Sequence, residues 1–216
     1  MTHATQPATP HAASRFVHRF EAGTDPTATP LLLLHGTGGD ENDLLPLGRT
    51  LAPGAALLSP RGQVLEHGMP RFFRRLAEGV FDEADVRRRA DELADFVSGA
   101  CVMQGLAPPI AVGFSNGANI AAALLYRRPD VLSGAVLLRA MVPLPEAPLG
   151  NLSGKRVLIL SGALDPIVPA ENAAQLAARL TAAGAEVEHR TLRAGHGLTE
   201  ADIALAQAWI MAKSAV

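Results

Sequence analysis

Cysteine is almost missing from this chain, which has one among its 216 residues, Cys101. A single cysteine excludes an internal disulfide and a zinc site made of several cysteines. Its place in a helical pattern predicts a small, buried apolar side chain. The chain also lacks a large excess of charges of one sign, since its formal net charge is -2. Such a balanced chain is not typical of proteins that bind nucleic acid.

Long apolar runs are also absent. No run approaches the roughly 20 residues that a membrane span requires. The N-terminus is rich in Thr, Pro, Ala and His, and it lacks the basic start and apolar core of a signal peptide. We therefore expect a cytoplasmic protein without a membrane partner, and a flexible tail over residues 1–14.

The chain does contain a regular alternation of strand and helix patterns, and residues 15–216 fit one domain. Strands are expected near 16–20, 31–34, 55–58, 110–115, 134–138, 156–160 and 186–192. Helices are expected near 42–51, 83–104, 116–127, 171–183 and 199–212. This alternation predicts an α/β fold with a mostly parallel central sheet and helices on both faces.

The most informative stretch is 110–119, which reads I-A-V-G-F-S-N-G-A-N. An apolar run meets the pattern G-x-S-x-G around Ser115, and an alanine-rich helical pattern follows. This context places the serine on a sharp turn from strand to helix, with its oxygen exposed at the end of the strand. Gly113 and Gly117 lack a Cβ, so the strand and the helix can approach closely, and the turn predicts strained backbone angles at Ser115. Ser115 is therefore the candidate nucleophile.

A serine hydroxyl becomes a nucleophile when a base takes its proton, and that base must itself be oriented. Two histidines follow Ser115 in the chain. His189 lies inside the last expected strand, whereas His196 lies just beyond it, between two glycines. Sites in open α/β sheets lie in the loops at the carboxyl ends of strands. The loop position favours His196 as the base.

The orienting carboxylate is expected between the serine and the histidine in chain order. Asp165 directly follows the strand at 156–160 and precedes Pro166, which fixes the chain after it. Asp130 lies at a helix end and Glu146 lies in a proline-rich loop. Asp165 is therefore the candidate acid, with a structural turn aspartate as the alternative reading.

Two backbone N–H groups are expected to face the charge that develops on a substrate carbonyl oxygen. Asn116, next to the nucleophile, supplies one, and Thr37 in the glycine-rich loop after 31–34 supplies the other. The same loop would suit a phosphate, but it lacks the Lys-Ser/Thr of a P-loop. His35 is expected to hold this loop by hydrogen bonds rather than to act on a substrate.

Four motifs in this order resemble the phospholipase/carboxylesterase family of α/β-hydrolases. They are L-H-G-T-G at 34–38, G-F-S-N-G at 113–117, D-P-I-V-P at 165–169 and G-H-G at 195–197. The family includes small bacterial carboxylesterases and acyl-protein thioesterases. Residues 61–82 resemble the branch of the small bacterial carboxylesterases. The resemblance implies an α/β-hydrolase fold without a large lid, no cofactor or metal, and a small ester as the substrate. Many members are dimers, so a homodimer stays open.

Residues 63–81 show no clean periodicity and predict an excursion over the surface that sets specificity. Met69, Phe72 and Phe73 are candidates to line an acyl or aryl pocket, with Met141 at its edge. The alternative, that these side chains only pack the excursion onto the body, is equally open.

The sequence thus predicts a serine carboxylesterase that hydrolyses small esters with short, medium or aryl acyl groups. Ser115, Asp165 and His196 would form and cleave an acyl-enzyme. One alternative is a lysophospholipase or acyl-thioesterase. Another is a non-catalytic protein of the same fold that binds a small apolar ligand, against which the presence of all three triad members argues.

Overall fold

The computed structural model describes residues 16–212, so the tail predicted over 1–14 lies outside the described residues. Its centre is a seven-stranded sheet with the order β1-β3-β2-β8-β9-β10-β11. The first strand is antiparallel to its neighbour, and the other six are parallel. The strands are β1 His18–Glu21, β2 Leu31–Leu34, β3 Leu57–Pro60, β8 Ile110–Phe114, β9 Gly134–Leu138, β10 Arg156–Gly162 and β11 Glu186–Leu192. This is the mostly parallel sheet that the alternation predicted.

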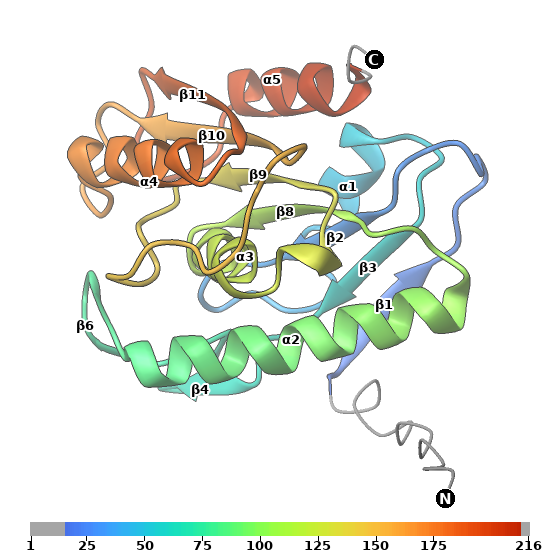
Figure 1. Cartoon of the computed structure of the whole chain (residues 1–216), viewed down its shortest axis with the longest axis horizontal. Helices are drawn as coiled ribbons and strands as arrows, with labels where there is room; N and C mark the ends of the chain where they lie inside the picture. The colour runs from blue at the N-terminus through green and yellow to red at the C-terminus, as the bar shows by residue number, and fades with distance from the viewer. Residues whose placement is uncertain (1–15, 213–216) are drawn as a thin grey trace, which may run out of the picture.

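Helices cover both faces of this sheet (Figure 1). They are α1 Leu45–Leu51, α2 Glu83–Gln104, α3 Asn116–Arg127, α4 Ala170–Ala182 and α5 Glu200–Met211, with a 3-10 turn, η1, at Pro129–Val131. One apolar cluster joins α2, α3 and α4 to the sheet, and a second joins α1 and α5 to the opposite face. The domain therefore has three layers, with the sheet in the middle.

The strand β2 shows why the sheet takes this buried place. Its four leucines are all fully buried. Leu32 and Leu34 belong to the cluster under α2 and α3, whereas Leu31 and Leu33 belong to the cluster under α1 and α5. Because successive side chains of a strand point to opposite faces, a continuous apolar run suits a sheet that is covered on both sides.

The helix boundaries follow local chemistry. The side chain of Thr199 accepts a hydrogen bond from the N–H of Asp202, and the two residues form a capping box at the start of α5. The helix α1 begins at Leu45, so the prediction of a start near 42 was wrong. Pro46 lies in the first turn, the one place where its missing N–H costs no helical hydrogen bond.

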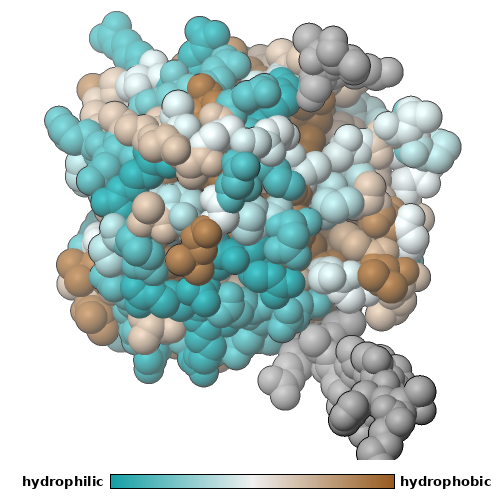
Figure 2. Space-filling view, in the orientation of Figure 1, coloured by the Kyte–Doolittle hydropathy of each residue, from teal (hydrophilic) through white to brown (hydrophobic). Residues whose placement is uncertain are grey.

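The segment 63–81 forms two small hairpins. They pair β4 Val64–Glu66 with β5 Met69–Arg71, and β6 Arg75–Ala77 with β7 Val80–Phe81. The β6–β7 hairpin exposes Leu76 and Val80, and brown surface appears in Figure 2 where Figure 1 places β6. The predicted excursion is therefore an ordered wall on the body.

The face over α2 is mainly hydrophilic in Figure 2. Arg87 pairs there with Glu83 and Glu146, while Cys101 on the inner side is buried, as predicted. Among the described residues, no helix has the length and apolar character needed to cross a membrane.

Candidate active site

The turn between β8 and α3 presents Ser115 in a strained conformation. Its φ is 52° and its ψ is -114°, a region that residues with a Cβ rarely adopt. A Cβ added at Gly117 would overlap the carbonyl oxygen of Leu34, and one added at Gly113 would press on the backbone of Gly117. The strain and the close approach that G-x-S-x-G predicted are both present.

Three side chains from separate loops meet at this turn. The Nε2 atom of His196 lies 3.0 Å from Oγ of Ser115, and its Nδ1 atom lies 2.8 Å from Oδ2 of Asp165. Asp165 follows β10 and His196 follows β11, so all three lie at the carboxyl edge of the parallel sheet. Such a chain of hydrogen bonds allows the imidazole to take the serine proton while the carboxylate holds the ring.

The carboxyl of Asp165 is held ionised inside this arrangement. Its side chain is fully buried, and that burial alone would raise its pKa. The N–H of Ile167, the ring of His196 and the N–H of Val168 all donate to it. These hydrogen bonds outweigh the burial and hold the pKa of Asp165 below its usual value.

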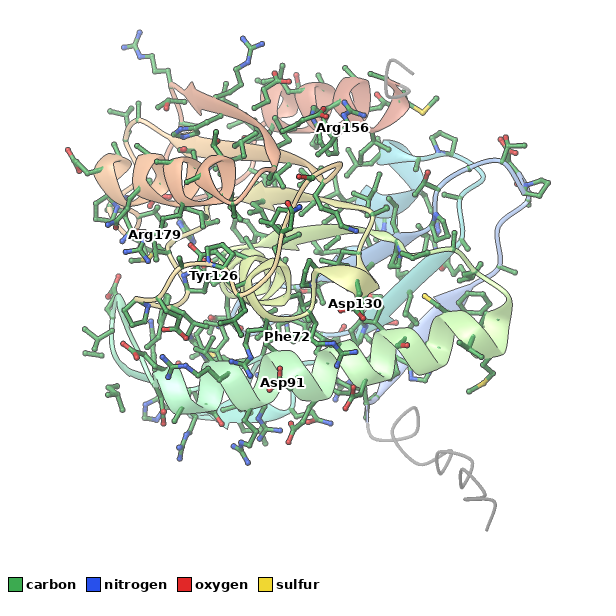
Figure 3. The ribbon with its side chains drawn as sticks, in the orientation of Figure 1. Phe72, Asp91, Tyr126, Asp130, Arg156 and Arg179 are labelled. Atoms are coloured by element: carbon green, nitrogen blue, oxygen red, sulfur yellow. The ribbon has the colours of Figure 1, made fainter. Side chains whose placement is uncertain are left out.

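The rejected candidates lie elsewhere. The ring of His189 bonds to the hydroxyl of Ser161 across β10 and β11. Asp130 pairs with Arg128 beside η1 and is labelled in Figure 3 on the α2 side of the molecule. Glu146 pairs with Arg87, which lies near the start of α2.

The loop after β2 is pinned by His35, as the sequence predicted. Its buried ring accepts a hydrogen bond from the N–H of Gly62 at 2.9 Å and bonds to the carbonyl of Gly36 at 2.7 Å. Burial lowers the pKa of His35 and keeps the ring neutral, as an acceptor must be. The ring thereby fixes the loop that carries Thr37.

Thr37 and Asn116 face the same space as Ser115, because all three line one cleft. Asn116 is the first residue of α3, where a backbone N–H has no acceptor within the helix. Its side-chain oxygen accepts from the N–H of Phe72 at 2.8 Å, which ties the turn to the residue that follows the β4–β5 hairpin. The N-terminal end of α3 thus points its positive end at the cleft.

Arg139 is the functional-site residue that the sequence analysis missed. It follows β9 with a φ of 59° and is fully buried. Its guanidinium donates to the carbonyls of Gly195 and Gly197, on either side of His196, at 2.9 and 3.1 Å. It also donates to Leu160 and to both oxygens of Asp202. All five of its N–H groups are therefore used to hold the histidine loop against β10 and α5.

A cleft of about 250 Å³ opens at Ser115. Its apolar wall is formed by Phe81, Phe114, Met141, Ile167 and Val168. Met141, one of the four pocket candidates, is among the residues that line this cleft.

The predicted roles of Phe72 and Phe73 in this wall were wrong. They are 2% and 0% exposed, and they belong to the apolar cluster that joins α2 and α3 to the sheet (Phe72 is labelled in Figure 3). Met69 is exposed near Gly38 and does not line the cleft. Among residues 16–212 no cluster of metal-ligating side chains is found.

Comparison with known proteins decides the family. The model of the family described as Phospholipase/Carboxylesterase matches residues 17–213. The chain belongs to the phospholipase/carboxylesterase family. It is a serine hydrolase of the carboxylesterase kind.

Relatives of this carboxylesterase-family hydrolase agree in length and fold. MhqD of Bacillus subtilis (strain 168), which carries the name of a hydrolase, is 47% identical over 194 residues, or 89% of this chain and 96% of that protein. The crystal structure of a Bacillus cereus carboxylesterase is 45% identical with a TM-score of 0.89, and the match covers 92% and 95% of the two chains. A structure of YahD with malic acid is 31% identical, with a TM-score of 0.85 and coverage of 90% and 98%.

Proposed function

We propose that this hydrolase cleaves small carboxylic esters, with Ser115 as the nucleophile, His196 as the general acid and base, and Asp165 as the residue that orients it. One observation carries the proposal. The hydrogen bonds from Ser115 to His196 and from His196 to Asp165 measure 3.0 and 2.8 Å, and Ser115 and His196 line the cleft. A serine on a strained turn, with a base in reach and an ionised carboxylate behind it, is arranged for acyl transfer.

In the proposed reaction, Oγ of Ser115 attacks the ester carbonyl while Nε2 of His196 takes its proton. The backbone N–H groups of Thr37 and Asn116 stabilise the negative carbonyl oxygen. His196 then gives the proton to the departing alkoxide, the bond from carbon to that oxygen breaks, and an acyl-enzyme remains. A water molecule, deprotonated by His196, attacks the acyl carbon, and Oγ leaves with the proton.

The dimensions of the cleft support a small acyl group. A cleft of about 250 Å³ lies just below the usual range for drug-sized ligands. The relative YahD has been solved with malic acid, which is itself a small, polar acid. Both observations favour short acyl chains over the long chains of a lysophospholipid or an acyl-protein.

The test combines labelling and turnover. The protein is treated with a fluorophosphonate, digested and analysed by mass spectrometry, and is assayed in single turnover with p-nitrophenyl esters from acetate to dodecanoate. We expect the label on Ser115, a burst of p-nitrophenol and the highest kcat/KM with short acyl chains. The Ser115→Ala variant should keep the fold by circular dichroism, take no label and lose at least about 10³-fold in turnover.

Other outcomes contradict the proposal. A rise of kcat/KM towards dodecanoate would favour the lysophospholipase or thioesterase alternative. A folded wild-type protein that takes no label and turns over no ester would favour the ligand-binding alternative instead.

A further inference from the structure

The cleft at Ser115 is lined by two chemically different sets of side chains. Besides the apolar wall, Arg71, Arg75 and Asn119 bring N–H donors to the space. One carboxylate also borders it, on the exposed side chain of Glu78 in the β6–β7 turn. A cleft for a purely apolar acyl group has no use for buried donors, because each one left without an acceptor is unfavourable.

Arg71 is buried, yet its hydrogen bonding is incomplete. Its side chain is 4% exposed. The guanidinium donates to the carbonyl of Phe73, to Oγ1 of Thr37 and to Glu66, through Nε and Nη1. Within the described residues, Nη2 has no acceptor, and it is not enclosed by protein either. The remaining two N–H groups of Arg71 are therefore available to a molecule in the cleft.

The charge around Arg71 is also incompletely compensated. Glu66 is shared, because it accepts from Arg71 at 3.0 Å and from Arg75 at 2.9 Å. Arg71 and Arg75 thus share the single carboxylate of Glu66. Burial lowers the pKa of Arg71, and Glu66 does not fully offset that effect. A second anion beside Nη2 would stabilise the charged guanidinium.

Asn119 adds a second donor to the same cleft. It is 5% exposed, and its Oδ1 atom accepts from the N–H of Met141 at 2.7 Å. That bond fixes which way the amide points. Its Nδ2 atom has no acceptor among the described residues and is not enclosed by protein. The amide therefore offers its two N–H groups to the cleft.

We infer that the cleft selects esters whose acyl group ends in a carboxylate, such as the half-esters of short dicarboxylic acids. Nη2 of Arg71 and Nδ2 of Asn119 bind the carboxylate, while the ester carbonyl lies at Ser115. The inference rests on the proposed function, since it specifies the substrate of the same site. The apolar wall contacts the methylene groups between the two ends of the acyl chain.

The test compares monomethyl glutarate with methyl valerate, in which a methyl group replaces the carboxyl group. Hydrolysis of both is followed by pH-stat titration. In the wild-type protein, kcat/KM should be about ten- to hundredfold higher for the half-ester, as expected for a charge-assisted hydrogen-bond pair. Equal or lower values for the half-ester overturn the inference.

Two variants locate the effect. Arg71→Gln removes the charge and should abolish the preference. Because Arg71 also holds Thr37, the ratio of the two substrates is the readout, not either rate. Asn119→Asp keeps the oxygen that accepts from Met141 and replaces the Nδ2 donor by an anionic oxygen, so it should reverse the preference. A ratio unchanged in both variants overturns the inference.

Arg74→Gln is the matched control. Arg74 is 62% exposed, pairs with Asp82 and does not line the cleft, so the wild-type preference should remain. A measurement that needs no substitution is competitive inhibition, in which glutarate should bind at least about tenfold more tightly than valerate. Turnover of both esters without a preference refutes this inference alone, whereas no turnover and no labelling of Ser115 refutes the proposed function itself.

Discussion

The guanidinium of Arg139 and the carboxylate of Asp202 form a two-pronged ion pair, with distances of 2.8 and 2.9 Å, in which both side chains are almost fully buried. Asp202 also caps α5 through Thr199. Arg139 meanwhile holds the carbonyls on both sides of His196. The pair therefore connects the start of α5, the end of β9 and the loop of the proposed base. The loop that carries His196 is therefore held by hydrogen bonds from Arg139, a residue outside the loop.

Arg139→Met should lower both stability and activity. It leaves Asp202 as a buried, unpaired charge, which costs about 3–5 kcal/mol of unfolding free energy. It also releases Gly195 and Gly197, and a shift of the base by about 1 Å lowers kcat by about 10²-fold. Urea denaturation and ester turnover measure the two effects.

Asp202→Asn is the matched control for that loop, because the guanidinium keeps its bonds to Gly195 and Gly197. We expect a loss of stability with a much smaller loss of kcat than in Arg139→Met. Equal losses of kcat in the two variants would show that the contacts to the loop are not what positions His196.

Asp165→Asn should leave the protein folded and lower kcat by about 10³–10⁴-fold. An amide cannot stabilise the imidazolium and favours the wrong tautomer of His196. Stopped-flow measurement of the acylation burst gives the rate. Asp130→Asn serves as the control. Asp130 also lies between Ser115 and His196 in the sequence, but its carboxyl is exposed, so this variant should retain wild-type turnover. An unaffected burst in Asp165→Asn would refute the role proposed for this carboxylate.

Stability should fall as the pH falls below about 6.5, the usual pKa of an exposed histidine. Burial lowers the pKa of His35 and of His189 in the folded state. The unfolded chain therefore binds more protons in this window, and unfolding becomes easier by at most about 1.4 kcal/mol per pH unit for each ring. Above that window both rings are neutral in the folded and the unfolded state, so the stability that they contribute is fully present.

Urea midpoints at pH 7.5 and 5.5 measure this dependence. His35→Gln should flatten it, since protonation of the wild-type ring also breaks the bond from Gly62. His67→Gln, at an exposed histidine, should leave the difference between the two midpoints unchanged. A dependence equally steep in His35→Gln would exclude His35 as its source.

Gly117→Ala should destabilise the turn by about 1–3 kcal/mol, the usual cost of forcing an extra methyl group into a packed interior. The new Cβ would overlap the backbone of Leu34, which cannot move without separating β2 from α3. Thermal denaturation tests this expectation. Gly197→Ala places its Cβ in open space and should melt close to the wild-type temperature.

Much of the fold could be predicted from the sequence because its signals are local. The bounds of α2 and β11 were predicted to the residue, and the apolar stripe of α2 is buried. The positions of Ser115, Asp165 and His196 follow from the rule that parallel strands end at one edge of the sheet. Their catalytic roles remain predictions.

The errors concern contacts between distant parts of the chain. Arg139 directly follows an apolar strand, and its partners lie 21 to 63 positions further on. Phe72 and Phe73 stand between arginines in the sequence, which favours an exposed segment. They are buried in the cluster that includes side chains of α2, α3 and the sheet, a packing relation that no local pattern contains.

The spacing of the proposed triad along the chain has a consequence for how the protein gains activity. Ser115 and His196 are 81 positions apart, and Asp165 and His196 are 31 apart. The base therefore reaches the nucleophile only after β11, the last strand in the chain, has joined the edge of the sheet. Loop closures over such separations come late in folding. A folding intermediate with most of its helices formed should thus show no esterase activity. Recovery of turnover during refolding therefore reports completion of the sheet rather than the initial collapse of the chain.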